Sequence, residues 1–490
     1  MKKIVLLICV SLLWCMVSTA SAGFVRNWVG NPDPSFCNPQ AWDGGVIPGP
    51  DDAVFIDSPP AQGPVIDCDV SVMEIHGPKI YADEDQVMAM ESGQLDAAGW
   101  TLSQTGNGTA TVNISGGSIV LDASRRPVPA DRWEPLIAGA NSGTSILNIS
   151  GDAVITTIGA ENALNLPTDP NGTFIMNISD NAQFITKQPW DGWKLADEGT
   201  AKVNISDNAK IKIQGRWRNA DQEEGYTEIN MTGGSLEVWG YLSVWDDGSG
   251  KFDFAGGTAY VGGISFRGRG GGETFELNVG GTADVTVDGE MRLLYGGPST
   301  STAVINVSGG SLTSSSLIMG EDPDATCTLE MTGGTFDAGD MTVPGEDAIA
   351  VINLHGGTVK CEEFAHAIVP GDFDEDGVVA WEDMAVFVGD WLNDCGEGGG
   401  PCGPGDLDRS GVVDLSDYVL FASRWADRPD WHMDVCGGTM IIDGDVTARI
   451  HADIAAGHIT ACGEAPGDSI VVDFDNLNPG KTTIRLDTAP

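Results

Sequence analysis

One short pattern of apolar and polar positions recurs along most of the chain. It places Asn between two apolar residues, adds Ser or Thr and then a Gly-Gly or Asp-Asn pair, and ends on a second apolar stretch. V-N-I-S-G-G-S-I around Asn113 and V-N-I-S-D-N-A-K around Asn204 are two copies. The alternation is typical of a half-buried strand, and Gly-Gly or Asp-Asn favours a turn with positive φ. Each copy therefore predicts strand, tight turn and strand.

The copies follow one another at a nearly constant spacing. Successive anchor positions lie 23 to 29 residues apart, with one interval of 35. This period predicts a mainly β fold, a parallel β-solenoid in which the anchors stack and their amides hydrogen-bond along the stack. A β-sandwich or propeller built from hairpins is the alternative. The anchors are Ala89, Asn113, Asn148, Asn177, Asn204, Asn230, Asp253, Asn278, Asn306, Glu330, Asn353 and, after an interruption, Asp434.

These anchors divide the chain into segments. We expect a signal peptide at 1–22, an N-terminal cap at 23–87, solenoid repeats at 88–365, an inserted module at 366–430 and final coils or a C-terminal cap at 431–490. In the N-terminal cap, Trp28, Trp42 and Phe55 are expected to cover the open end of the core. The phrases N-W-V-G-N-P-D and A-W-D-G-G-V-I-P-G-P-D-D-A-V-F-I-D of this cap resemble the entry region of secreted bacterial proteins with a right-handed parallel β-helix, of the pectin-lyase-like and autotransporter-like type.

The charge of the chain excludes some classes of partner. It contains 25 Lys and Arg against 71 Asp and Glu, a net charge of −46. This charge repels nucleic acid and anionic membrane surfaces, so a nucleic-acid-binding function is excluded. Lys2 and Lys3, the apolar run from Ile4 to Val17 and the small residues Ala20-Ser21-Ala22 are typical of a secretory signal peptide. No later apolar stretch is long enough for a membrane span. We expect a soluble protein that is secreted, extracellular or at the cell surface.

The cysteines fit that compartment. Eight remain after the signal peptide, an even number that favours disulfides over zinc. Their spacing suggests neighbouring pairs, although eight cysteines allow about 105 connectivities, and the short turn C-G-E-G-G-G-P-C favours its own pair most. The suggested pairs are Cys37 with Cys68, Cys327 with Cys361, Cys395 with Cys402, and Cys436 with Cys462.

A second motif occurs twice within 366–430. The two copies begin at Asp372 and Asp406, 34 residues apart, and each places oxygen-bearing residues and a Gly at the spacing of a calcium loop followed by an apolar helix. Between 370 and 430 there are 15 acids and 3 bases, and such crowding is costly unless a cation offsets it. We therefore expect two Ca²⁺ sites. Their ligands would be Asp372, Asp374, Asp376, the Val378 carbonyl and Asp383 in the first loop, and Asp406, Asp408, Ser410, the Val412 carbonyl, Asp414 and Asp417 in the second.

This duplicated loop and helix resembles the type I dockerin family over 372–428. The resemblance implies two bound calcium ions and docking to a cohesin-type module of a scaffolding protein, in a secreted polysaccharide-degrading context. The chain departs from the family in three places. Ala380 at loop position 9 has no ligating side chain, so the first site would use water or bind more weakly. Trp381-Glu382 and Leu415-Ser416 stand where the family has its partner-recognition residues, which leaves a purely structural calcium staple as the alternative.

A further candidate surface lies in the middle of the repeats. Eleven of the 25 bases fall between Lys187 and Arg292, interleaved with aromatic residues. Counted from their anchors, Trp190 and Trp217 lie at +13, whereas Arg218, Arg267 and Arg292 lie at +14, so stacked coils would align them on one face. Such a stripe suits sugar stacking and an anionic or neutral polysaccharide; residues that merely cover the turns are the alternative. The candidates are Trp190, Trp217, Arg218, Trp245, Arg267 and Arg292.

Two functions follow from these patterns. The first is non-catalytic glycan or surface binding and adhesion by a secreted solenoid that carries a calcium module. The second is a polysaccharide lyase or glycoside hydrolase of β-helix type, with its substrate groove along the 190–292 stripe. A purely structural adhesin or surface-layer role is a third. No catalytic signature is recognisable, so the sequence names no catalytic residue.

Overall fold

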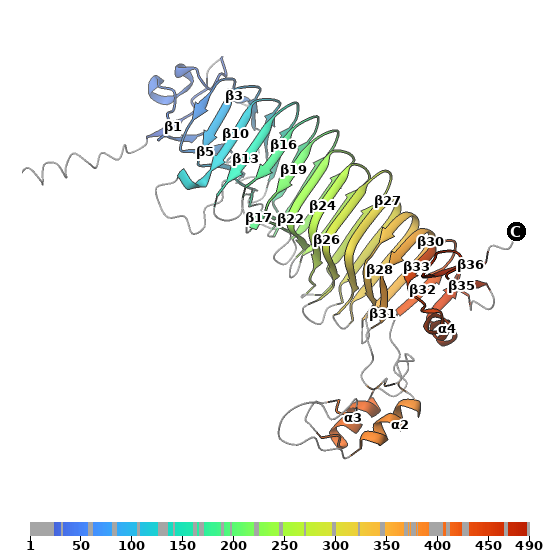
Figure 1. Cartoon of the computed structure of the whole chain (residues 1–490). Helices are drawn as coiled ribbons and strands as arrows, with labels where there is room; N and C mark the ends of the chain where they lie inside the picture. Colours follow the sequence, from blue (N-terminus) through green and yellow to red (C-terminus); the bar gives the residue numbers. More distant parts are fainter. Residues whose placement is uncertain are drawn as a thin grey trace, which may run out of the picture.

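The recurring phrase folds into a mainly β protein, a parallel β-solenoid of about 12 turns (Figure 1). The structure is a computed structural model. It describes residues 24–487 except for 31–32, 57–61, 81–85, 105–107, 126–135, 141–142, 160–163, 166–170, 188–190, 197, 220–224, 245–247, 269–270, 296–299, 322–323, 344–347, 367–370, 372, 374–378, 380, 392–404, 408–411, 424–430 and 465–468. The expected signal peptide at 1–22 lies outside the described residues.

Each coil passes along three faces, named here in chain order. The strands confined to the first face are β3 (Gln62–Ile66), β6 (Gln86–Met90), β9 (Thr109–Ile114), β12 (Thr144–Ile149), β15 (Thr173–Ile178), β18 (Thr200–Ile205), β21 (Tyr226–Met231), β23 (Ser249–Phe254), β25 (Thr274–Val279), β32 (Trp431–Val435) and β34 (Ile459–Ala461). Those confined to the second face are β4 (Val70–Ser71), β7 (Gln94–Ala97), β10 (Ser118–Asp122), β13 (Val154–Ile158), β16 (Gln183–Thr186), β19 (Lys210–Ile213) and β33 (Thr439–Asp443).

The third face and the corners complete each coil. The strands confined to the third face are β1 (Val25–Asn27), β2 (Ala53–Phe55), β5 (Glu74–Ile80), β8 (Gly99–Gln104), β11 (Leu136–Ala140), β14 (Leu164–Asn165), β17 (Asp191–Leu195), β20 (Arg216–Asn219), β29 (Asp340–Val343) and β31 (Glu363–His366). Longer strands turn one or two corners: β22 (Ser235–Val244), β24 (Thr258–Phe266), β26 (Asp284–Leu293), β27 (Thr302–Met319), β28 (Thr326–Asp337) and β30 (Ile349–Cys361). Short 3₁₀ turns are η1 (Pro39–Ala41), η2 (Asp43–Gly45) and η3 (Ala123–Arg125).

The register of the first face follows the predicted anchors. Asn113 pairs with Asn148 and Asn148 with Asn177, and the alignment continues through Asn353 to Asp434. The Asn side chains point outward and are half-buried. The amide of Asn177 donates to Asn148 Oδ1 at 2.7 Å and accepts from Asn204 Nδ2 at 2.7 Å. The expected amide ladder is therefore present.

The inward positions form the core. Their side chains stack on apolar residues of the coils above and below, and each fully buried side chain contributes about 2 kcal/mol relative to exposure. One inward column of the first face consists of Val112, Leu147, Met176, Val203, Ile229, Phe252, Leu277, Ile305, Leu329, Ile352 and Met433, all at most 1% exposed. The strict alternation of each strand, with period two, places these residues inside.

Different structures cover the two ends of the solenoid. At the N-terminal end Trp28 and Trp42 are 3% and 2% exposed and pack edge to face. Strands β1, β2 and β5 of the expected cap already pair in parallel and are therefore part of the stack. At the other end β36 (Lys481–Leu486) pairs antiparallel with β33 and with β35 (Ile470–Phe474), beside helix α4 (Thr447–Ala456).

The chain interrupts the solenoid between β31 and β32. Because β32 pairs in register with β30, the coil resumes where it stopped. The intervening segment contains α2 (Trp381–Asp390) and α3 (Leu415–Ser423), which Figure 1 shows side by side and away from the coils. They share a small core of Val379, Phe387, Val413 and Phe421. In the described part of the chain no helix is long and apolar enough to cross a membrane.

Candidate binding surface at a corner of the solenoid

The tryptophan of the predicted stripe that the structure describes lies inside the solenoid. Trp217 is fully buried, and its ring packs against Trp193 with centroids 4.6 Å apart. It therefore stabilises the core, and its assignment to a surface stripe is wrong. Strand β20 alternates, so Trp217 points inward while Arg218 points outward. Trp190 and Trp245 lie outside the described residues.

The predicted arginine column is correct for two of its three members. Arg218 pairs with Ser243, Ser243 with Ser265 and Ser265 with Arg292. Arg267 lies two residues beyond Ser265, after the end of β24, and so is outside this register column. Its guanidinium group is nevertheless near that of Arg292, because the two lie 5.9 and 4.2 Å from the ring centroid of Tyr295. A constant offset from the anchor fails here because bulges at the corner, between Val238 and Tyr241 and between Val261 and Ile264, change the number of residues per coil.

Exposed aromatic side chains gather where β22 and β24 turn from the second face to the third. Trp239 is 54% exposed, Tyr241 44% and Tyr260 40%. The ring of Tyr241 lies over Gly263, where a Cβ would come within 2.6 Å of the ring, so only glycine permits this contact. Exposed aromatic rings with one free surface are the side chains on which sugar rings stack. We name this region the corner surface.

On the second-face side, the corner surface borders a hollow of about 620 Å³. This second-face hollow is lined by aromatic, carboxylate and hydroxyl side chains of β22, β24 and β26. The lining residues are Ser235, Leu236, Glu237, Trp239, Thr258, Ala259, Tyr260, Asp284 and Thr286. Its size and mixed lining suit a small polar ligand with an apolar face.

The orientation of Trp239 is set by its neighbours. Its indole Nε1 donates to Glu237 Oε1, and Lys212 Nζ lies 4.8 Å from the ring centroid. Lys212 Nζ also lies 2.9 Å from Glu237 Oε1. Burial opposes ionisation of Glu237, but the hydrogen bonds from Trp239 and Lys212 hold its pKa below the ordinary value. Glu237 is therefore an anion at neutral pH.

A smaller hollow of about 200 Å³ lies on the third-face side of the corner. This third-face hollow contains two guanidinium groups, those of exposed Arg216 and of Arg292. The guanidinium carbon of Arg292 lies 4.2 Å from the ring centroid of Tyr295. The same group forms ion pairs with Glu321 and, from Nε to Oε1 at 3.8 Å, with Glu290. The lining residues are Arg216, Tyr241, Ser243, Ser265, Glu290, Arg292 and Tyr295.

The expected calcium ligands are described only in part. Asp372, Asp374, Asp376, Val378, Asp408 and Ser410 lie outside the described residues. Asp383 and Asp417, at equivalent places 34 residues apart, are fully buried, and Asp406 is 5% exposed. Asp383 accepts from the Phe373 amide at 2.5 Å, and Asp417 from that of Asp414 at 2.8 Å, while Val412 and Asp414 are partly exposed. Within the described ranges no group of three or more His, Cys, Asp or Glu side chains is placed to hold a metal.

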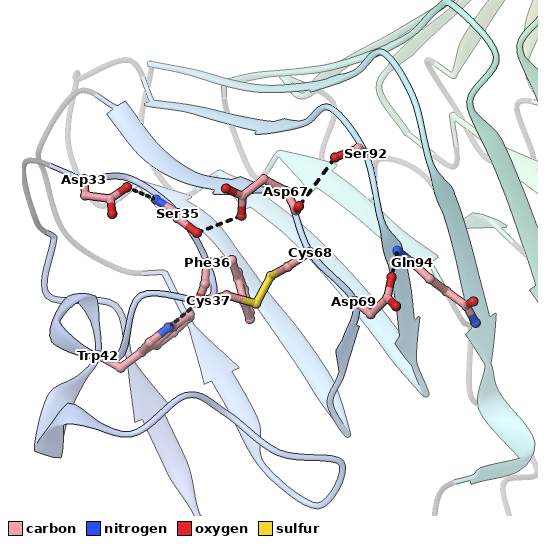
Figure 2. Close-up of a disulfide and its surroundings, with 10 residues drawn as sticks. All are labelled: Asp33, Ser35, Phe36, Cys37, Trp42, Asp67, Cys68, Asp69, Ser92 and Gln94. Atoms are coloured by element: carbon pink, nitrogen blue, oxygen red, sulfur yellow. Dashed lines mark hydrogen bonds between the residues drawn. A yellow bond between two sulfur atoms is a disulfide. The ribbon is translucent and has the colours of Figure 1, made fainter.

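Two of the four suggested disulfides are present. Cys37 bonds to Cys68 and Cys436 to Cys462. Figure 2 shows the first bond beside Phe36, whose carbonyl accepts from Trp42 Nε1, so the bond ties the covering segment to the coil. The pairing of Cys327 with Cys361 is wrong. Both are buried thiols, Cys327 on the first face and Cys361 on the second, where they pack as small apolar residues. Cys395 and Cys402 lie outside the described residues.

Comparisons with known protein families, with curated proteins and with solved structures find no match to this chain.

Proposed function

We propose that this protein is a secreted, non-catalytic glycan-binding solenoid that binds polysaccharide at the corner surface. The observation that carries the proposal is the pair of exposed aromatic rings, Trp239 and Tyr260, that line a hollow of about 620 Å³, with exposed Tyr241 at the adjoining smaller hollow. Proteins rarely expose several aromatic rings together without a ligand or partner. The two disulfides among the described residues fit an oxidising extracellular compartment.

A glycan array probed with the whole protein tests this function. Trp239→Ala should abolish the bound signal, because it removes the most exposed ring of the corner surface. Trp381→Ala is the matched control, since Trp381 is 73% exposed but belongs to the inserted segment. A blank array, or equal loss with both variants, would contradict the proposal.

We also propose that the inserted segment is a dockerin-like module with two Ca²⁺ sites. The duplicated motif supports this, and so do Asp383 and Asp417, because a fully buried carboxylate is stabilised by a nearby cation. The helices also expose Trp381 and Val388 of α2 and Leu415 and Val419 of α3. Exposed apolar side chains of this kind can be buried by a cohesin-type module. Capture of such a module with calcium but not with EDTA, and its loss in Trp381→Ala, is the expected result.

A β-helix lyase or hydrolase is the second candidate function. Glu290 lines the third-face hollow together with Arg216 and Tyr295, which brings a carboxylate, a guanidinium and a phenol to one place. These groups could take part in acid-base work on a bound sugar acid. Release of oligosaccharide from polygalacturonate, lost in Glu290→Gln, would establish this function in place of simple binding.

A further inference from the structure

We propose that the second-face hollow selects neutral sugar rings and excludes acidic ones. This inference rests on the proposed glycan binding and adds the class of ligand. It starts from the contrast between the two hollows, which flank the same corner but differ in charged lining residues. The second-face hollow is lined by the carboxylates of Glu237 and Asp284, whereas the third-face hollow is lined by the guanidinium groups of Arg216 and Arg292 together with one carboxylate, Glu290.

A further carboxylate, that of Asp288, lies next to the residues that line the second-face hollow. Asp288, which is exposed, accepts a hydrogen bond from the Tyr260 hydroxyl and thereby raises the pKa of Tyr260. Two lysines of β19 border this hollow, because Lys210 pairs with Ser235 and Lys212 with Glu237. The Lys212 ammonium group hydrogen-bonds to both oxygens of Glu237 at 2.9 and 3.0 Å. Asp284 and Asp288 lie on β26, three strands from β19 and its two lysines, so an acidic sugar at that side of the hollow would be repelled.

The same groups suit a neutral sugar. Carboxylates accept hydrogen bonds from sugar hydroxyls, and these charge-assisted bonds are about twice as strong as neutral ones. Asp284 already accepts from Ser311 Oγ at 2.5 Å, which fixes one of its oxygens. The hydroxyls of Ser235, Thr258 and Thr286 line the hollow and can donate or accept.

Trp239 supplies the apolar contact in a fixed position. Its hydrogen bond to Glu237 and its contact with Lys212 restrain the ring before any ligand arrives. A restrained ring loses little conformational entropy when a sugar stacks on it. Glu237 therefore positions Trp239. Because its charge is paired with Lys212, the repulsion of acidic sugars comes mainly from Asp284 and Asp288.

The test compares neutral and acidic oligosaccharides of equal length on the full chain. The neutral probes are hexasaccharides of glucose (β-1,4 and β-1,3), xylose and mannose; the acidic probes are hexamers of galacturonate, mannuronate and glucuronate. Calorimetric titration should show at least one neutral probe that binds about tenfold tighter than every acidic probe. Its affinity should not change between 50 and 500 mM salt and should be lost in Trp239→Ala.

A charge-neutralising variant makes the test specific. Glu237→Gln with Asp284→Asn keeps the acceptor oxygens but removes two charges, so binding of an acidic probe should rise about tenfold. Asp152→Asn with Asp207→Asn changes the net charge equally at exposed turns outside the hollow and should leave selectivity unchanged. This pair separates local repulsion from the overall charge of the chain.

Several results would overturn the inference. One is that acidic probes bind as tightly as neutral ones and both are lost in Trp239→Ala. Another is that the charge-neutralised variant gains no binding of acidic probes. Either result refutes the selectivity but leaves glycan binding at the corner intact. Tighter, salt-sensitive binding of a glucosamine hexamer would show that the hollow selects cations. If no probe binds, both the selectivity and the proposed function fail.

Discussion

Replacing one amide of the ladder by a better strand former should destabilise the solenoid. Asn177 donates to Asn148 and accepts from Asn204, both at 2.7 Å. Each neutral hydrogen bond contributes about 1 kcal/mol net, so Asn177→Thr loses about 2 kcal/mol. Thr has a higher strand propensity than Asn, which stabilises the variant by at most about 1 kcal/mol. The variant should therefore be less stable by about 1 kcal/mol.

Native-state hydrogen exchange is the appropriate assay for this change. Stacked coils contact mainly their neighbours, so a single unfolding midpoint would average many local openings. We expect the free energy of opening to fall for amides of β12, β15 and β18 and to stay unchanged far along the stack. Gln183→Thr is the matched control, because Gln183 is an outward amide on β16 outside the ladder. This substitution should be neutral or stabilising.

The sign of the effect decides the argument. If Asn177→Thr raises the opening free energy as Gln183→Thr does, strand propensity outweighs the ladder. The amides would then be tolerated at these positions without stabilising them, and the register would be set by the apolar core alone.

Three further predictions concern calcium, a disulfide and a buried carboxylate. Calorimetry of the full chain should show two calcium-binding events, both lost in Asp372→Ala with Asp406→Ala; unchanged binding would contradict the dockerin-like assignment. Cys37→Ser with Cys68→Ser opens a loop with a sequence separation of 31 and should cost about 3–4 kcal/mol, measured as unfolding free energy with and without reductant. Burial raises the pKa of Asp453 from 3.8 to about 6. The folded state therefore binds the Asp453 proton more tightly than the unfolded state does. As a result, the free energy of unfolding rises as the pH falls from about 6 to about 4. Asp453→Asn should therefore be more stable than the native protein by about 2 kcal/mol at pH 8, a gain that disappears near pH 4 in urea titrations; an equal gain at both pH values would refute this reading.

The fold could be predicted further than the candidate site. The phrase around each Asn has a period of two and ends in a positive-φ turn. It therefore predicts the first-face strand, the turn after it and the second-face strand that follows. Register from Ala89 to Asp434 followed from it, across an insertion of more than sixty residues. The third face has no such phrase. Trp217 was misplaced because adjacent positions of β20 alternate between the inside and the outside, and Arg267 because bulges in β22 and β24 change the number of residues per coil.

The corner residues carried a weaker signal. Tyr260 lies between inward Ala259 and Val261, so alternation alone places it outside, and Trp239 precedes a glycine at a bend. Neither observation says that β22 and β24 bring the two rings to the same hollow. That proximity depends on how many residues each coil spends at its corner, a quantity set by backbone geometry that composition does not record.

The antiparallel strands β35 and β36 at the C-terminal end stop the stack of parallel coils from continuing. In-register parallel coils with an amide ladder share the architecture of cross-β fibres, which grow because each exposed end templates the next layer. Here β36 pairs antiparallel with β33, the last strand of the second face. β33 therefore has no free edge to which another parallel strand could add. Growth in that direction would require β36 to detach, and its detachment rate would set how fast two copies could join end to end.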